Sequence, residues 1–266
     1  YPSRINFGKT ENRGLELILS HKHKIGDFNY NVRSNLTWAR NKVLKLSQDP
    51  YKTKYTSSIG KPTGQIWGFI AEGLFQSQEE LDESAVFGQV PIGRSSIPEM
   101  IFGIDLGGQY KNFDFNMFLQ GASLFDVEVA GLYTDRGFKD HTFYTRPFFA
   151  GGNSPRELIE NSWTPENPNA KYPRLGIELR SNGSAHSSLY VQDGTYLRLK
   201  SAQIGYNIPK NIVNNMGAQN LRFYISGTNL FTLSGLDFGL DPEMPSVNQG
   251  YYPPQRIYEF GLNLTF

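Results

Sequence analysis

One segment constrains the fold of this chain more than any other: FNYNVRSNLTW, residues 28–38. Its even positions carry Phe, Tyr, Val, Ser, Leu and Trp, while every odd position carries a polar residue. A period of two is typical of a β-strand with one apolar and one polar face. Eleven residues at about 3.3 Å each, tilted by about 45°, rise about 25 Å, which is the height of the apolar band of an outer-membrane barrel. The segment therefore predicts a strand long enough to cross a membrane.

Further alternating segments raise the predicted number of strands to seven. The connections between them are alternately short and long, which is typical of an outer-membrane barrel with short periplasmic turns and long external loops. Seven strands leave two edges unpaired, so we expect part of a larger barrel. The six other strands are predicted at residues 14–22, 102–106, 113–119, 194–209, 220–231 and 256–266, and the long connections at about 45–100, 122–193 and 233–255.

Composition excludes several classes of protein. The 26 Lys plus Arg nearly balance the 25 Asp plus Glu, so nucleic acid is not an expected partner. No apolar run approaches the roughly 18 residues that a spanning helix needs, whereas alternating strands cross a membrane at low mean hydropathy. The chain has no cysteine, which excludes disulfides and thiolate metal sites.

A series of longer motifs occurs along nearly the whole chain. In order they are NRGLELIL, YKNFDFNMFLQG, SWTPENPNAKYPRL, DGTYLRLKSAQIGYNIP, LRFYISGTNLFTLSG followed by GLDPE, and RIYEFGLNLTF. Together they resemble the carboxy-terminal part of the SusC/RagA-type TonB-dependent transporters of Bacteroidota outer membranes. Any one motif is weak, but the ordered set is specific.

The resemblance implies a fold and a function. Residues 1–266 would form an all-β, antiparallel transmembrane segment of about seven strands within a plugged barrel of about 22 strands. The whole transporter would import glycans or oligopeptides through the outer membrane, with energy from TonB and a SusD-like surface lipoprotein as its lid. No cofactor and no bond chemistry are expected.

The sequence departs from the family pattern at two places. It lacks a plug domain and a TonB-contact segment, so TonB is expected to act through a missing amino-terminal part. Where family members carry an Asp- and Gly-rich loop, residues 87–92 read only FGQVPI, and no metal site is predicted there.

Two sets of side chains are candidates for contact with cargo. Polar residues on the strand face opposite the apolar one are expected to face the lumen, although most would simply be solvated or bonded to the plug. Aromatic residues in the long loops offer flat faces on which sugars or peptides could pack, or they pack against neighbouring loops or a lid protein. Packing is favoured for WTPENPNAKYP, residues 163–173, because its recurrence in the family motif suggests a framework role. The lumen candidates are Asn29, Asn31, Arg33, Asn35, Asp114, Asn116 and Gln120, and the loop aromatics are Trp67, Tyr144, Trp163, Tyr172, Tyr251 and Tyr252.

The sequence offers little support for metal binding or catalysis. His21 and His23 are two residues apart, but a third ligand is not apparent and their lysine neighbours would repel a cation. Ser, His and Asp occur together in the segment around His186, but no nucleophile elbow accompanies them. A polar loop therefore explains these residues better than a catalytic triad does. The acidic pairs are better explained as loop anchors than as a general acid and base; they are Glu79 with Glu80 and Asp241 with Glu243.

The last strand is a candidate assembly signal. An alternating strand that ends in Phe resembles the sequence that the barrel-assembly machinery recognises, and its apolar face is expected to meet lipid. The face consists of Tyr258, Phe260, Leu262, Leu264 and Phe266.

Two alternatives of different classes stay open at this level. A soluble secreted β-sandwich that binds glycans through exposed aromatic residues would also have alternating strands, but it would bury its apolar faces against each other. A surface hydrolase would need a paired catalytic constellation, which the sequence does not supply.

Overall fold

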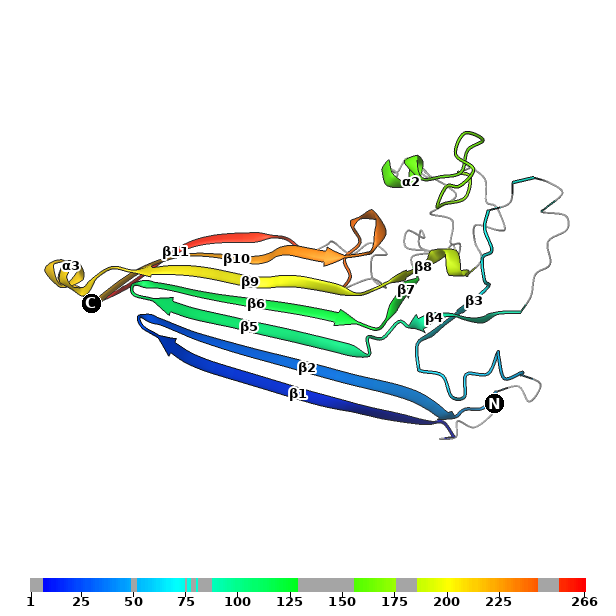
Figure 1. The fold of residues 1–266 in the computed structure, drawn as a ribbon, viewed down its shortest axis with the longest axis horizontal. Coiled ribbons are helices and arrows are strands. Elements are labelled where there is room, and N and C mark those ends of the chain that lie inside the picture. The colour runs from blue at the N-terminus through cyan, green and yellow to red at the C-terminus, as the bar shows by residue number, and fades with distance from the viewer. Residues whose placement is uncertain are drawn as a thin grey trace, which may run out of the picture.

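The computed structural model describes residues 7–48, 52–74, 76–77, 80, 88–128, 156–175, 186–243 and 254–266. Seven long strands form one sheet, and the small elements gather mainly at one end of it (Figure 1). No helix in these ranges is both long and apolar enough to cross a membrane. The strands are β1 Lys9–Ile25, β2 Phe28–Lys45, β3 Gln65–Gly68, β4 Val90–Ser95, β5 Met100–Tyr110, β6 Phe113–Ser123, β7 Asp126–Glu128, β8 Val191–Asp193, β9 Tyr196–Asn207, β10 Asn220–Ser234 and β11 Ile257–Thr265; the helices are α2 Arg156–Glu160 and α3 Lys210–Asn215, with 3-10 turns η4 Ser188–Tyr190 and η5 Asp237–Gly239.

The large sheet is an antiparallel meander in the order β1-β2-β5-β6-β9-β10-β11. At one end, Gly26 and Asp27 turn β1 into β2, with Gly26 at a φ of 60° that suits glycine, and Lys111 and Asn112 turn β5 into β6. The third short connection contains α3, and the long connections lie at the other end (Figure 1). The predicted all-β class, the seven strands and the unequal ends are confirmed.

Five of the seven strands are longer than the alternation predicted, β9 and β11 are slightly shorter, and some short strands were missed. The strand predicted at 28–38 runs to Lys45, because its later residues pair with the start of β1. The pairs β3 with β4 and β7 with β8 lie inside regions that were predicted only as long connections. They are too short to show a period in the sequence.

The two faces of the sheet have opposite chemistry. Residues directly opposed on antiparallel strands point to the same face, so the pairing register assigns each side chain to a face. One row across all seven strands reads His23, Tyr30, Gly108, Phe115, Ile204, Ile225 and Phe260; the adjacent row, on the other face, reads Lys22, Asn31, Gly107, Asn116, Gln203, Ser226 and Glu259.

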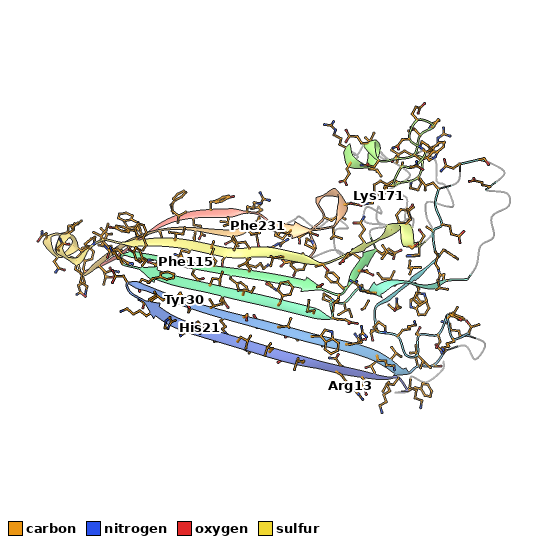
Figure 2. The ribbon with its side chains drawn as sticks, in the orientation of Figure 1. Arg13, His21, Tyr30, Phe115, Lys171 and Phe231 are labelled. Atoms are coloured by element: carbon orange, nitrogen blue, oxygen red, sulfur yellow. The ribbon has the colours of Figure 1, made fainter. Side chains whose placement is uncertain are left out.

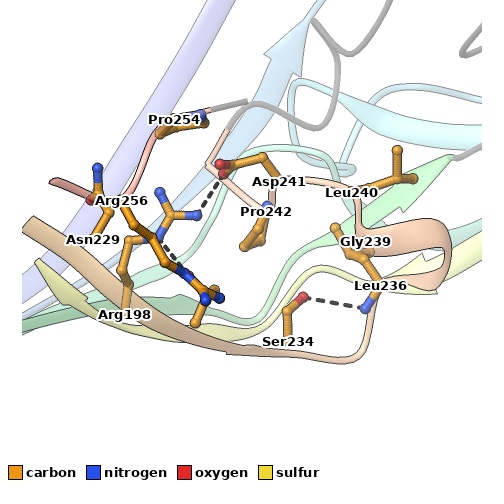
Figure 3. A pocket seen from close by; sticks show the side chains of 11 residues that line it. Arg198, Asn229, Ser234, Leu236, Gly239, Leu240, Asp241, Pro242, Pro254 and Arg256 are labelled. Atoms are coloured by element: carbon orange, nitrogen blue, oxygen red, sulfur yellow. Dashed lines mark hydrogen bonds and ion pairs between the residues drawn. The ribbon is translucent and has the colours of Figure 1, made fainter. Parts of the chain in front are cut away.

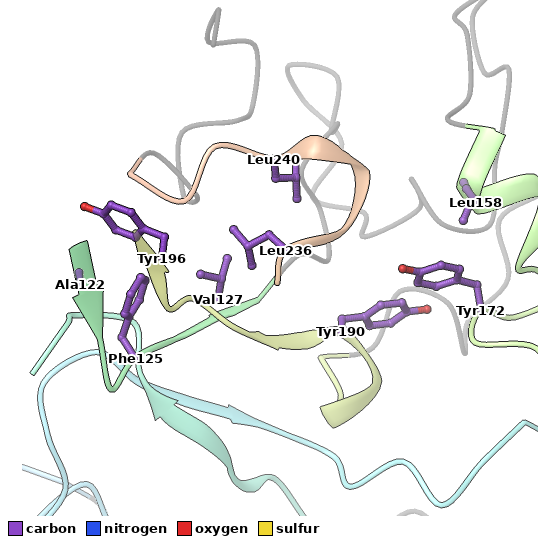
Figure 4. Packing of buried hydrophobic residues seen from close by; sticks show 9 residues of the cluster. All are labelled: Ala122, Phe125, Val127, Leu158, Tyr172, Tyr190, Tyr196, Leu236 and Leu240. Carbon is purple, nitrogen blue, oxygen red and sulfur yellow. The ribbon is translucent and has the colours of Figure 1, made fainter. Parts of the chain in front are cut away.

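Most of the buried hydrophobic side chains lie outside the middle of the sheet. The main cluster, seen in Figure 4, gathers at the long-loop end. A smaller cluster packs α3 against the start of β10. By contrast Leu19, Ile204 and Phe260, on the apolar face, are 58%, 62% and 81% exposed. The main cluster consists of Ala122, Phe125, Val127, Leu158, Tyr172, Tyr190, Tyr196, Leu236 and Leu240.

Candidate functional site

The polar face of the sheet carries the residues that the sequence analysis proposed for the lumen. Asn31 is level with Asn116 through Gly107, and Asn35 is level with Gln120 through Gly103. The seven candidates therefore share one face, as the alternation predicted. They are Asn29, Asn31, Arg33, Asn35, Asp114, Asn116 and Gln120.

An ion pair fastens the polar face near the short turns. Arg222 on β10 donates two hydrogen bonds to Asp114 on β6, of 3.0 Å from Nε and 2.5 Å from Nη2. The Asn207 amide donates to the same carboxylate at 3.1 Å. The guanidinium of Arg222 lies across Gly205, where a β-carbon would collide with it. A glycine on β9 thus lets β6 and β10 contact each other over the strand between them.

A second, deeper network lies on the polar face at the long-loop end. Arg198 on β9 has a side chain only 4% exposed. Its guanidinium donates to Asp241 at 2.9 Å, to Glu243 at 2.6 Å and to Thr232 at 2.8 Å. Lys200 also donates to Glu243, at 2.8 Å. The chain after β10 is therefore folded back onto the polar face and held there by buried charges (Figure 3).

The register of the sheet explains how Lys200 joins Arg198. The pairing of β9 with both neighbours shifts at this point. Relative to β6, Lys200 is an extra residue between Leu199 and Ser201, and on β10 the two residues Asn229 and Leu230 lie opposite it. Such a bulge re-aims side chains and is common next to functional sites. Here it places two cations side by side under the returning loop.

A cavity of about 310 Å³ opens between the returning loop and the sheet. Figure 3 shows Arg198 and Arg256 close together at its wall, with Asp241 and Pro242 above them. Its size is at the low end for a small-molecule site. The arrangement holds polar groups in place and contains no nucleophile paired with a base among the residues that line it, so it is suited to binding.

A third network joins the 156–175 region to the returning loop. Asp237 accepts hydrogen bonds from the Tyr172 hydroxyl, from Lys171 and from Gln192, and its own amide donates to the Gln192 side chain at 2.9 Å. Burial, followed by the Asp237 hydrogen bond, raises the pKa of Tyr172. Burial also raises the pKa of nearby Tyr190 to about 12.

The loop aromatics have different fates. Tyr172 is 1% exposed, so its ring packs within the loops, as was favoured for WTPENPNAKYP, and it is not available to cargo as a candidate contact. Trp67 lies on β3 and Trp163 donates from Nε1 to Gln76 at 2.9 Å; both are half-buried, and their contact with cargo stays a prediction. The candidates that fall outside the described residues are Tyr144, Tyr251 and Tyr252.

The histidines are held by ordinary contacts. The His21 ring lies 6.1 Å from that of His23 and its Nε2 is 3.2 Å from the Tyr30 hydroxyl. His186 Nδ1 lies 2.5 Å from Glu128 Oε1, and the adjacent loop is fixed by Ser188, whose hydroxyl accepts from the Ala71 amide. Across the part of the chain that the structure describes, no group of three potential metal-binding residues comes together.

The acidic pairs proposed as loop anchors differ in what can be seen. Asp241 and Glu243 bind Arg198 as described above, which fits an anchoring role. Glu80 accepts from the Gln76 amide at 2.8 Å, while Glu79 lies outside the described residues. Sequence reasoning found the carboxylates but missed Arg198; the alternation of β9 followed by DPE was the only available signal.

The last strand has the predicted faces. Its outward residues pair with Leu221, Phe223, Ile225 and Gly227 of β10. All are exposed, from 42% to 81%, and none packs in a cluster of buried residues. They are Tyr258, Phe260, Leu262, Leu264 and Phe266, and their role in assembly stays a prediction.

Comparison with known proteins finds relatives among the TonB-dependent receptors. TonB-dependent receptor P26 of Formosa agariphila is 28% identical over 98% of this chain, and SusC of Bacteroides thetaiotaomicron is 25% identical over 98%. The structure of the RagAB peptide transporter matches 98% of this chain with a TM-score of 0.71 at 20% identity, which shows the same fold. The chain is therefore similar, over nearly its whole length, to SusC/RagA-like TonB-dependent receptors.

The match covers only part of each relative. This SusC/RagA-like chain spans 30% of the P26 receptor, 27% of SusC and 29% of the RagAB chain it matches. No protein-family model matches it. The likeness therefore applies to a segment of each receptor.

Proposed function

We propose that this chain is the carboxy-terminal part of a SusC-like TonB-dependent transporter and forms part of its barrel wall and external loops. The transporter would lie in the outer membrane and import glycans or oligopeptides. The observation that carries the proposal is the seven-stranded sheet, with one continuous apolar face, one polar face, short turns at one end and long connections at the other.

The faces favour a wall between lipid and water. In a membrane barrel, lipid-facing residues are apolar and alternate with lumen-facing polar ones. The row with Ile204, Ile225 and Phe260 would then meet acyl chains, and the row with Asn116, Gln203 and Ser226 would meet water, plug or cargo. Each face keeps its apolar or polar character across seven adjacent strands, which supports lipid on one side of the sheet and water on the other.

A secreted β-sandwich is the less well supported alternative. A sandwich covers its apolar face with a second sheet about 10 Å away. Among the described residues, the two other sheets are two-stranded and lie at the long-loop end, while Leu19, Ile204 and Phe260 are more than half exposed. A wall that meets lipid accounts for that exposure, whereas a sandwich does not.

The network of ion pairs around Arg198 suggests how this part of the chain would serve transport. It holds the returning loop on the polar face, where the cavity would face cargo descending from the outside. A SusD-like lipoprotein would cap the loops, and TonB would act on a plug placed outside residues 1–266. The chain itself would position cargo and carry out no bond chemistry.

The test uses neighbouring residues of β10 on opposite faces. This chain has no cysteine, so Ser226→Cys and Ile225→Cys introduce single reporters into it. In intact full-length protein in outer membranes, a water-soluble maleimide should label Cys at 226, and only a lipid-soluble maleimide should label Cys at 225. Equal labelling of both sites by the water-soluble reagent would contradict the proposal that the sheet separates lipid from water.

Substrate class needs a separate measurement. Deletion of the full-length gene should abolish uptake of either labelled glycans or labelled oligopeptides, and return of the gene should restore it. Persistent hydrolysis of either substrate by the purified receptor would instead favour a hydrolase.

A further inference from the structure

A group of cations lies on the outward, apolar-side face of β1 and β2 at their long-loop end. The register places Arg13 opposite Arg40, Glu11 opposite Lys42 and Lys9 opposite Lys45. On β1, Lys9 and Arg13 share the parity of Leu15 and Leu17, and on β2, Arg40 and Lys42 share the parity of Leu36 and Trp38, so these side chains point to the same side as the apolar band. Lys45 has the opposite parity on β2 but lies opposite Lys9, because the register shifts by one residue at Leu44. The basic patch is defined as Lys9, Arg13, Arg40, Lys42 and Lys45.

The patch begins where the apolar band ends. Trp38 and Leu15 are paired, and Arg40 and Arg13 form the next outward pair, about 7 Å farther along the strands. Aromatic residues mark the interface of a membrane barrel, with the polar head groups beyond them. Cations one step past Trp38 are therefore at head-group height.

The charge of the patch is concentrated and open to solvent. The Arg13 and Arg40 side chains are 80% and 65% exposed, and all five residues of the patch are exposed. Glu11 pairs with Arg13 and Glu99 pairs with Arg40, so five cations face two carboxylates and the local net charge is +3. The whole chain carries only +1.

The patch lies at one end of β1 and β2, and the sheet next to it is apolar. Level with Trp38 and Leu36, just before the patch, the outward positions of β5, β9 and β10 carry Met100, Leu197 and Leu233. At the other end of β1 the outward residues are His21 and His23, and Figure 2 shows His21 far from Arg13 along the strand. A general attraction to both membrane surfaces would not need this asymmetry.

We infer that the basic patch binds the phosphate groups of a phosphorylated glycolipid in the outer leaflet. The inference rests on the proposed function, which puts the long-loop end outside the cell. Arginine binds phosphate through parallel N–H donors, and lysine adds point charges. Leu15, Leu17 and Trp38 lie directly below, where the acyl chains of the same molecule would run. One ligand with phosphates above and acyl chains below thus fits the surface.

The experiment measures glycolipid retained by full-length receptor extracted from outer membranes. The test variant is R13Q/R40Q/K42Q. The control is K22Q/K24Q/K111Q, which removes the same charge from the polar face and from a turn at the short-turn end. Native mass spectrometry in mild detergent would count bound lipopolysaccharide and bound phospholipid for each protein.

The test variant should retain at least tenfold less lipopolysaccharide, since each basic residue near an anionic lipid surface contributes appreciable affinity. The control should match the wild type, and added inorganic phosphate at millimolar concentration should not displace the lipid. Equal loss in both variants, displacement by free phosphate, or a loss confined to phospholipid would overturn the inference. Heat-modifiable migration on gels reports that each barrel is folded.

Failure here is distinguishable from failure of the proposed function. A receptor that is found in the outer membrane and imports its cargo, yet retains lipopolysaccharide equally in all variants, contradicts only the glycolipid site. A receptor absent from the outer membrane contradicts the proposed function itself.

Discussion

Replacing Arg198 with Met should release the returning loop from the polar face. The side chains of Arg198 and Asp241 are 4% and 7% exposed, so the pair is shielded from water. Breaking a buried ion pair by removing one partner costs about 3–5 kcal/mol, because it leaves an uncompensated charge. Here two carboxylates, Asp241 and Glu243, would lose their guanidinium, and only Lys200 would remain for Glu243.

Hydrogen exchange of full-length receptor in detergent measures the effect. A loss of about 3 kcal/mol corresponds to roughly a hundredfold faster exchange, since 1.4 kcal/mol is a factor of ten. The increase should appear in amides 236–243 and leave those in the middle of β9 and β10 nearly unchanged. The matched control is Arg156→Met, whose salt bridge to Glu160 is exposed at 89% and 55% and contributes little.

A second variant separates charge from packing. Arg198→Met combined with Asp241→Asn and Glu243→Gln removes the unpaired charges, so it should recover most of the lost protection. Unchanged exchange in Arg198→Met, or equal exchange in the single and triple variants, would refute the claim that buried charge holds the loop.

Three further predictions concern the wall and the loops. Deletion of Phe266 should lower the amount of inserted barrel, measured by heat-modifiable migration, and unchanged insertion would contradict an assembly role. Leu262→Lys should reduce insertion, because a lysine at the midplane of the lipid face costs about 2–4 kcal/mol, whereas Asn263→Lys on the polar face should not. Similar amounts of inserted barrel for the two variants would contradict the assignment of Leu262 to the lipid face. Because the pKa of Tyr172 is raised in the fold, its contribution is complete below the unfolded pKa of about 10 and falls above it. Protection of the loop amides against hydrogen exchange should therefore fall between pH 10 and 12, and Tyr172→Phe should make this fall smaller. An identical pH profile in the variant would exclude Tyr172 as the cause of the fall.

The seven-stranded sheet could be predicted because the alternation that marks a strand is visible within one short segment of sequence. A residue two positions away lies on the same face, so FNYNVRSNLTW displays both of its environments within one segment. The end of β2 was missed for a physical reason as well. Arg40 and Lys42 continue the outward face but leave the apolar band, so the apolar period stops before the strand does.

The loop networks were not predictable because their partners are distant in sequence. Asp237 lies 65 residues from Tyr172 and 45 from Gln192, and Asp241 lies 43 from Arg198. No period or spacing encodes which of many polar loop residues will meet. The burial of Tyr172 follows from its contact with Asp237, so its motif favoured packing within the loops but did not indicate the partner.

The distribution of buried side chains separates the seven-stranded sheet, whose apolar face is exposed, from the loops, which bury their own apolar side chains. Transfer of a large apolar side chain from water is worth about 1.5–3 kcal/mol, yet Leu19, Ile204 and Phe260 gain little of this within the chain. On the proposed function, lipid or detergent would cover this apolar face. The cluster around Tyr190 and Leu236 excludes water by itself. Arg198 lies on β9 and Asp241 lies in the returning loop, so the buried ion pair between them fixes the position of the loop on the sheet.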